Sequence, residues 1–261
     1  MTESEKRNLD RLPSRRAFVT TSAAAAATIG LLSACNSKAD ETKSAEIPPA
    51  PQEPPIVALT KEARDQMTPD SIIAKLKEGN TRFREGRKIP RDFLAEQRAT
   101  ASGQFPAAVL LSCVDSRAPA EILFNLGMGD VFNARVAGNI ENPDILGSLE
   151  FTTKLAGAKV VLVMGHSACG AVAGAIANAK LGNLTQLLAK IQPAIKATKY
   201  DGNRTADNAE FVDAVARTNI NLTIASIRKN SKVIADLEKA GTIKIAGAYY
   251  DLKTGAVAFS A

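Results

Sequence analysis

Two short motifs of this sequence contain side chains able to do metal chemistry. The first contains Cys113, Asp115 and Arg117, and the second, 53 residues later, contains His166 and Cys169. His166 is the one histidine in 261 residues. Zn²⁺ prefers four tetrahedral ligands from thiolate, imidazole or carboxylate, and a catalytic zinc site keeps one position for water or substrate. Two cysteines and one histidine supply three ligands, and Asp115 is close enough to compete for the fourth. We therefore expect a zinc site.

The elements around the motifs predict an α/β fold. Continuous apolar runs of strand length, typical of strands buried on both faces, cover residues 107–111, 130–135 and 159–164. Helical patterns cover residues 69–84, 91–100, 118–124, 144–155, 168–179, 184–197, 209–229 and 232–240. Alternating strands and helices indicate a mostly parallel central β-sheet flanked by helices. Residues 243–250 and 256–259, joined by a turn, predict an antiparallel C-terminal edge hairpin.

This sheet explains how two distant motifs can form one site. Cys113 follows the first buried strand, and His166 follows the third. In an open parallel sheet the carboxyl ends of the strands form the crevice where ligands bind, so we expect the motifs to meet there. Cys169 lies near the start of a predicted helix, where free N–H groups and the helix dipole favour thiolate over thiol.

Composition argues against nucleic acid as a partner. The chain has 33 Lys and Arg against 27 Asp and Glu, a net charge of +6, and no basic run longer than a dipeptide. It has 9 Phe, 3 Tyr and no Trp, too few aromatic residues for a platform that stacks bases. We therefore expect no nucleic-acid footprint.

The amino end has the features of a targeting segment. Arg15 and Arg16 precede a weakly hydrophobic stretch, residues 21–32, which is too short to span a bilayer and ends just before Cys35. Residues 1–34 resemble a twin-arginine signal peptide with a lipobox. This resemblance implies lipidation of Cys35 and an exported lipoprotein, anchored to the membrane on the periplasmic or cell-surface face. An ordinary secretory signal with a chance cysteine is the alternative, and it too directs the chain out of the cytoplasm.

Two further segments follow the signal. Residues 35–59 begin with the lipidated cysteine and include five prolines between Pro48 and Pro55, which predicts an extended, semi-rigid tether. Residues 60–261 form the predicted folded domain.

The two remaining cysteines have a second interpretation. In an exported protein an even pair of thiols usually forms a disulfide, and the cysteine count alone favours a Cys113–Cys169 bridge. A disulfide, however, needs neither His166 nor the Asp115 and Arg117 pair. Taken singly, these side chains could be a core histidine, a helix N-cap and a surface ion pair. Their combination favours a metal site.

Together, Cys113-x-Asp115-x-Arg117 and His166-x-x-Cys169 resemble the β-class carbonic anhydrases. The similarity extends over nearly all of residues 70–261. It implies zinc held by Cys113, His166 and Cys169, with Asp115 and Arg117 as a functional pair. Asp115 would either bind Arg117 and leave water on the metal, or turn onto zinc and close the site. The family forms dimers or multiples of dimers, so a homodimer is expected.

The resemblance also implies an activity, the reversible hydration of CO2 to bicarbonate and a proton by zinc-bound hydroxide. Gln104 matches a glutamine that helps hold substrate across the dimer interface, and the backbone N–H of Gly170 could hold a substrate oxygen. Two thiolates and a neutral imidazole leave zinc formally uncharged. Such a site lowers the pKa of bound water less than a three-histidine site, which reaches about 7, so activity should rise into mildly alkaline pH.

Two other functions remain open at this point. A relative on the same scaffold could hydrolyse another small electrophile, such as carbon disulfide, because fold and ligands do not separate the two reactions. A non-catalytic lipoprotein could instead bind zinc or respond to redox state, with Cys113 and Cys169 alternating between metal and disulfide. Asp115, Arg117 and Gln104 have no role in that second alternative.

Overall fold

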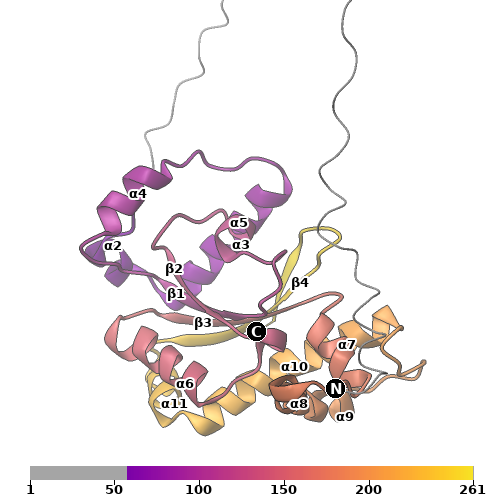
Figure 1. Cartoon of the computed structure of the whole chain (residues 1–261). Coiled ribbons are helices and arrows are strands. Elements are labelled where there is room, and N and C mark those ends of the chain that lie inside the picture. Colours follow the sequence, from indigo (N-terminus) through magenta and orange to yellow (C-terminus); the bar gives the residue numbers. More distant parts are fainter. Residues whose placement is uncertain (1–57, 261) are drawn as a thin grey trace, which may run out of the picture. The chain divides into compact units, whose positions relative to one another are not determined.

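A five-stranded sheet lies at the centre of residues 58–260, the part of the chain that this computed structural model describes (Figure 1). The strand order is β2-β1-β3-β4-β5. All neighbouring pairs are parallel except β4 and β5, which are antiparallel. The bounds are β1 Ala108–Ser112, β2 Val131–Arg135, β3 Val160–His166, β4 Lys244–Tyr250 and β5 Val257–Ser260. The predicted fold class, with its antiparallel edge hairpin, is confirmed.

Two of the three continuous apolar runs form the central strands β1 and β3. The expectation that residues 130–135 are also buried on both faces is wrong, because this run forms the edge strand β2. Every residue of β1 and of β3 is buried, as expected where helices cover both faces of a sheet. Strand β2 lies at the edge and has mixed burial, with Val131 and Ala134 buried and Arg135 exposed. In the register of the sheet, Ser112 of β1 lies beside Met164 of β3. The residues that follow these two strands therefore emerge at the same edge.

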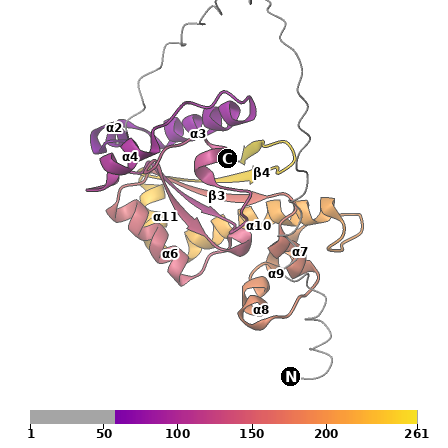
Figure 2. The ribbon, with the colours of Figure 1, turned by 45° about the horizontal axis from the view of Figure 1, so that its top comes forward.

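Helices cover the two faces in separate groups (Figures 1 and 2). The residues that alternate along β1 and β3 divide between two hydrophobic clusters: Leu110 and Leu162 belong to one, and Leu111 and Val163 to the other. The first face carries α2 Lys61–Gln66, α3 Pro69–Arg84, α4 Phe93–Thr100 and α5 Ala120–Leu123. The second face carries α6 Pro143–Glu150, α7 Gly170–Ile176, α8 Gly182–Ala189, α9 Gln192–Ala197, α10 Ala209–Asn230 and α11 Lys232–Lys239.

Helix α3 has the bounds that the sequence predicts. Thr68 caps it, accepting from the Ser71 backbone N–H, while the Ser71 hydroxyl accepts from the Thr68 N–H. Gly79 lets the helix lie directly against the chain at Phe124, since a Cβ at Gly79 would be 1.8 Å from the Phe124 carbonyl oxygen. No helix within residues 58–260 is long and apolar enough to cross a membrane.

Several predicted helix bounds are wrong. The single helix expected over residues 184–197 is two helices, α8 and α9, and Pro193 stands in the first turn of α9, where proline is tolerated. The bounds of the helix expected over 144–155 are confirmed, since α6 continues without a break into a π-helical segment, Phe151–Leu155. Helix α7 begins at Gly170 rather than at Ala168, because Ala168 has a left-handed backbone, with φ +51°. The helix expected over residues 118–124 is shorter, since α5 has only four residues.

Candidate metal centre

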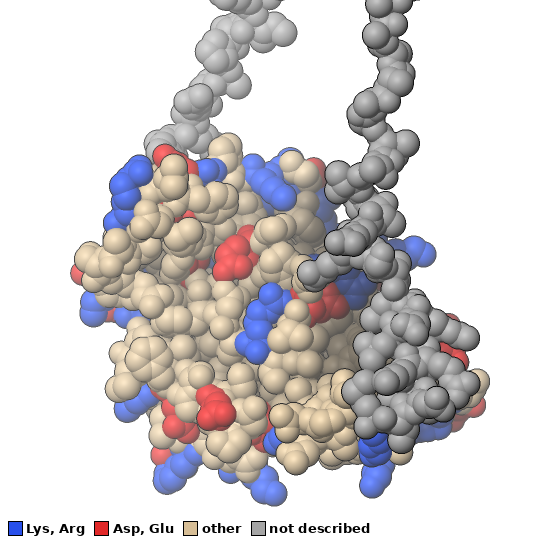
Figure 3. Space-filling view, viewed as in Figure 1, with Lys and Arg blue, Asp and Glu red and all other residues tan. Residues whose placement is uncertain are grey.

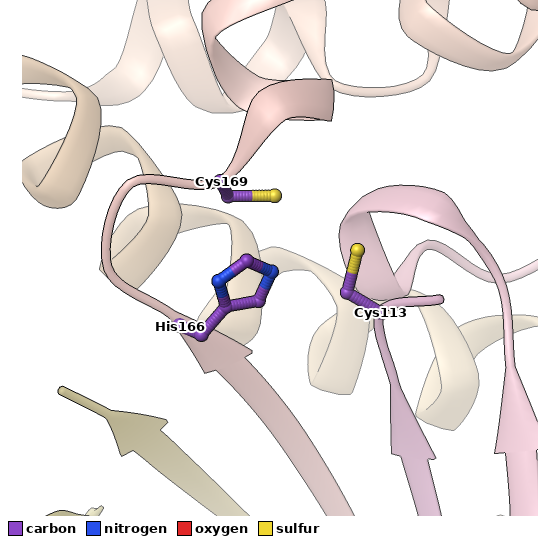
Figure 4. A group of neighbouring side chains, drawn as sticks. All are labelled: Cys113, His166 and Cys169. Atoms are coloured by element: carbon purple, nitrogen blue, oxygen red, sulfur yellow. The ribbon is translucent and has the colours of Figure 1, made fainter. Parts of the chain in front are cut away.

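Three side chains from two strand ends and one helix start converge in a buried cluster (Figure 4). Cys113 follows β1 directly, His166 is the last residue of β3, and Cys169 is the N-cap of α7. Their ligand atoms all lie within 4.8 Å of one another. Each residue is at most 5% exposed, and the side chains point toward one another.

The hydrogen bonds of His166 suit it to bind a cation. Its Nδ1 lies 2.9 Å from the carbonyl oxygen of Ser167. A carbonyl only accepts, so in the neutral ring Nδ1 carries the proton and Nε2 presents its lone pair. That Nε2 atom is buried and has no hydrogen-bond partner. A buried unpaired nitrogen costs free energy that a bound metal would remove. Both Cys113 and Cys169 are free thiols in this structure. One imidazole and two thiols form a donor set that fits zinc.

Backbone N–H groups and a shared proton set the electrostatics of the two sulfurs. The hydrogen bond from the Cys169 thiol lowers the pKa of Cys113 against the effect of burial, and the Gly138 N–H, 3.3 Å from Cys113 Sγ, adds to this. The same bond raises the pKa of Cys169, together with burial. Because metal ligands must be deprotonated, binding of a divalent cation would release the shared proton.

Burial lowers the pKa of His166, but the neighbouring Cys113 sulfur and the Ser167 carbonyl raise it by more, so the net change is an increase. The pKa of His166 is raised because its ring faces the anionic sulfur of Cys113. A cation at the cluster would instead favour the neutral ring, because it competes for the Nε2 lone pair.

Asp115 is held beside the cluster by Arg117. Two guanidinium nitrogens of Arg117 donate to the two carboxylate oxygens, Nε to Oδ1 at 2.9 Å and Nη2 to Oδ2 at 2.7 Å. The Arg117 backbone N–H also donates to Oδ1. This pairing holds the pKa of Asp115 well below its usual range, so the carboxyl is ionised. Asp115 Oδ2 is 3.8 Å from His166 Nε2. The carboxylate therefore borders the cluster while it is bound to arginine.

Two residues that sequence reasoning did not single out, and one glycine that belongs to the family resemblance, support this arrangement. Arg135, the last residue of β2, donates from Nε to the Cys113 carbonyl at 2.8 Å and from Nη2 to the Asp115 carbonyl. Asp213 of α10 accepts from the Ala168 N–H at 3.0 Å, within the loop that joins the two ligands of the second motif. Gly138 donates to Cys113 Sγ. Only Gly138 had a sequence signal, because Gly138-Asn139 is part of the resemblance to the β-class carbonic anhydrases.

The two predicted substrate-binding residues lie in different places. Gly170 is the first residue of α7, directly after Cys169, with open space where a Cβ would be. Gln104 is exposed in the loop after α4 and lines a cavity with Thr100, Met128 and neighbouring residues, and no residue of the metal cluster lines that cavity. The structure of one chain therefore does not bring Gln104 to the cluster. Cys35 lies outside the described residues.

Comparisons with known proteins give a consistent result. Residues 108–257 match a family model described as "Carbonic anhydrase". Carbonic anhydrase 2 of Mycobacterium tuberculosis is 33% identical over 186 residues, which are 69% of this chain and 87% of that protein. Carbonic anhydrase of Mycolicibacterium smegmatis is 33% identical over 188 residues, covering 70% of this chain and 88% of its own.

Solved structures share the fold at lower identity. The β-carbonic anhydrase CcaA matches with a TM-score of 0.58 and 22% identity, over 72% of this chain and 87% of its own. One match from Sordaria macrospora, from work on two tetrameric β-carbonic anhydrases, has a TM-score of 0.57 and 22% identity, over 74% of this chain and 94% of its own. These likenesses show that the sheet and its helices have the same architecture.

Proposed function

Because the chain belongs to the β-class carbonic anhydrase family, we propose that Cys113, His166 and Cys169 hold the zinc ion with which it hydrates CO2 reversibly to bicarbonate and a proton. The observation that carries this assignment is the buried three-residue cluster with its unpartnered His166 Nε2. Zinc, when bound there, supplies a positive charge that lowers the pKa of a coordinated water molecule and makes it nucleophilic.

The chain's own residues then orient the reactants. Asp115 is fixed and ionised by its double hydrogen bond from Arg117, so it can accept a hydrogen bond from the attacking water and direct a lone pair at the carbon of CO2. The Gly170 N–H, at the start of α7, can donate to a substrate oxygen. Burial of the cluster keeps bulk water from competing for these positions.

A comparison of zinc content with CO2 hydration in the wild type and in Asp115→Ala tests this function. The variant keeps the three metal ligands, so we expect one zinc per chain in both proteins. We expect the rate of CO2 hydration, measured by stopped flow, to fall about 100-fold or more in the variant. A loss of this size is typical when a positioned proton-accepting side chain is removed. Asp201→Ala, at an exposed position outside the site, serves as a control with unchanged activity. A wild type without zinc or without hydration would refute the proposal.

We propose that the active form is a homodimer or a multiple of dimers. Among the large apolar side chains that are exposed in the described part of the single chain are Val114 (57%), Phe151 (54%) and Leu155 (76%). Val114 lies between Cys113 and Asp115 in the sequence. Much of the face in Figure 3 carries neither acidic nor basic side chains. Clustered exposed apolar side chains are typical of an interface. Gln104, which does not reach the cluster of its own chain, would then serve the cluster of the partner.

We also propose that the enzyme is exported and membrane-anchored. The support is the order of features in the sequence, with Arg15 and Arg16, a short apolar stretch and Cys35, all outside the described residues. Export in the folded state would allow zinc to be loaded while Cys113 and Cys169 are reduced. Cys35→Ser should abolish labelling with a fatty-acid precursor and release the protein from membranes. An unchanged membrane fraction would contradict the anchor.

A further inference from the structure

The side chain of Asn219 makes a specific contact behind the metal centre. Asn219 lies in the middle of α10 and is 3% exposed. Its Nδ2 donates to the carbonyl oxygen of Gly138 at 2.8 Å, a contact between positions 81 residues apart. Gly138 belongs to the short 3₁₀ segment Ala137–Asn139, which follows β2.

Gly138 connects this contact to a metal ligand. Its N–H donates to Cys113 Sγ at 3.3 Å, so one residue accepts from Asn219 and donates to the sulfur. The residue has φ +71°, a left-handed conformation that glycine adopts without strain. A Cβ at this position would lie 2.7 Å from Ile191 Cδ1 and 3.4 Å from Ala171 Cβ. Glycine is required here, and its conformational freedom means that the direction of the N–H depends on what holds the carbonyl.

We propose that Asn219 is a positioning residue for the zinc site, acting through Gly138 on Cys113. This inference rests on the proposed function. The Asn219 amide fixes the Gly138 carbonyl and thereby aims the Gly138 N–H at the Cys113 sulfur. An N–H directed at a thiolate fixes the position of the sulfur and reduces the negative charge that it offers to the metal. Partners of metal ligands typically change metal affinity or activity by about 10- to 100-fold when they are removed.

The residues around Asn219 explain why an amide side chain is needed at this position. Most of the other buried residues of α10 near Asn219 are apolar, including Val215, Ala216 and Ile220. An apolar side chain of similar size would fill the same space. It would leave the buried Gly138 carbonyl without its donor, and the segment would shift to find another. A shift of Gly138 moves the N–H away from Cys113.

The test measures zinc affinity and the thiolate spectrum in full-length variants. Asn219→Leu keeps the size and removes the donor, while Asn219→Ser is a smaller polar change whose hydroxyl is too short to replace the amide. Thr223→Val is the matched control, because Thr223 is also buried on α10, one turn later, and is 5% exposed. Zinc dissociation constants come from competition with a chelator. The sulfur-to-metal charge-transfer band is recorded after cobalt substitution. The dissociation constant and the charge-transfer band are both measured under conditions in which circular dichroism shows that each variant is folded.

We expect both Asn219 variants to bind zinc about 10-fold more weakly or worse and to change the position or intensity of the charge-transfer band. Thr223→Val should match the wild type in both measurements. A merely structural role would lower the melting temperature of the metal-free protein and leave the spectrum of the folded protein unchanged. Wild-type zinc affinity and spectrum in Asn219→Ser, or equal losses in Thr223→Val, would overturn the inference. Failure of the wild type to bind zinc would instead overturn the proposed function.

Discussion

The carbonyl oxygen of the neighbouring residue, Ser167, fixes the tautomer of His166. It accepts from Nδ1 and leaves Nε2 for a metal. The sequence could predict that His166, Cys113 and Cys169 meet, because two motifs that follow parallel strands must emerge at one edge of the sheet. It could not predict Asp213 or Asn219. Both lie on α10, and their contacts with the site depend on how that helix packs rather than on any local pattern.

The single histidine leads to a prediction about proton transfer. CO2 hydration produces a proton that must leave the site, and histidine is the side chain that ordinarily titrates near neutral pH. His166 is buried within the metal cluster and is therefore unable to carry protons to solvent. We expect the steady-state hydration rate to rise with the concentration of an imidazole-type buffer at constant pH and ionic strength. A rate that is independent of buffer concentration would show that another group of the chain carries the proton.

Among the elements, α10 and α11 show what the sequence could predict, and α8 and α9 show what it could not. The bounds of α10 and α11 were close to prediction, since both helices have a side-chain cap and a clear apolar face. The break between α8 and α9 was missed, because the apolar pattern continues through Ile191, which is fully buried between the two helices. Periodicity reports burial and cannot by itself show where one helix ends and another begins.

One ion pair that joins α10 to α11 should contribute stability that depends on pH. Arg228 donates to both carboxylate oxygens of Glu238, at 2.7 and 2.8 Å, and this lowers the pKa of Glu238. A carboxyl whose pKa is lowered on folding stabilises the protein above its unfolded pKa, about 4.3, and loses that contribution as pH falls through the folded pKa. Since the pair is partly exposed, we expect Glu238→Gln to cost about 0.5 to 1 kcal/mol near neutral pH.

Urea unfolding at neutral and acidic pH measures this effect. The difference in unfolding free energy between Glu238→Gln and the wild type should shrink as the pH is lowered through the acidic range. Asp236→Asn is the control, because Asp236 pairs with Lys232 on the exposed side of the same helix, 61% exposed, and should cost less. An equal cost of Glu238→Gln at all pH values would mean that packing, rather than charge, explains the loss.

For the whole molecule, the arrangement of Gln104 decides whether one chain is enough. Gln104 lies in a cavity separate from the metal cluster of its own chain, and Val114, next to Cys113 in the sequence, is exposed. In the dimer proposed above, the second copy of Gln104 would serve this site. The sequence could suggest this role only through family resemblance, because an interface residue leaves no pattern in its own chain.

Subunit mixing tests the dimeric site. Gln104→Ala and Asp115→Ala should each be nearly inactive alone. If Gln104 serves the partner's site, a mixed dimer contains one intact site, and equal mixing with free exchange restores about a quarter of wild-type activity. Activity that stays at the level of the separate variants after confirmed subunit exchange would show that Gln104 acts within its own chain or has no role.

Zinc X-ray absorption of the purified full-length protein, recorded together with its CO2 hydration rate, tests the central assignment most directly. The account predicts one zinc per chain, two sulfur ligands at about 2.3 Å from Cys113 and Cys169 and lighter ligands at about 2.0 to 2.1 Å, in a preparation that hydrates CO2. A metal-free protein with Cys113 and Cys169 joined as a disulfide and no hydration, or a bound zinc without sulfur ligands, would contradict it.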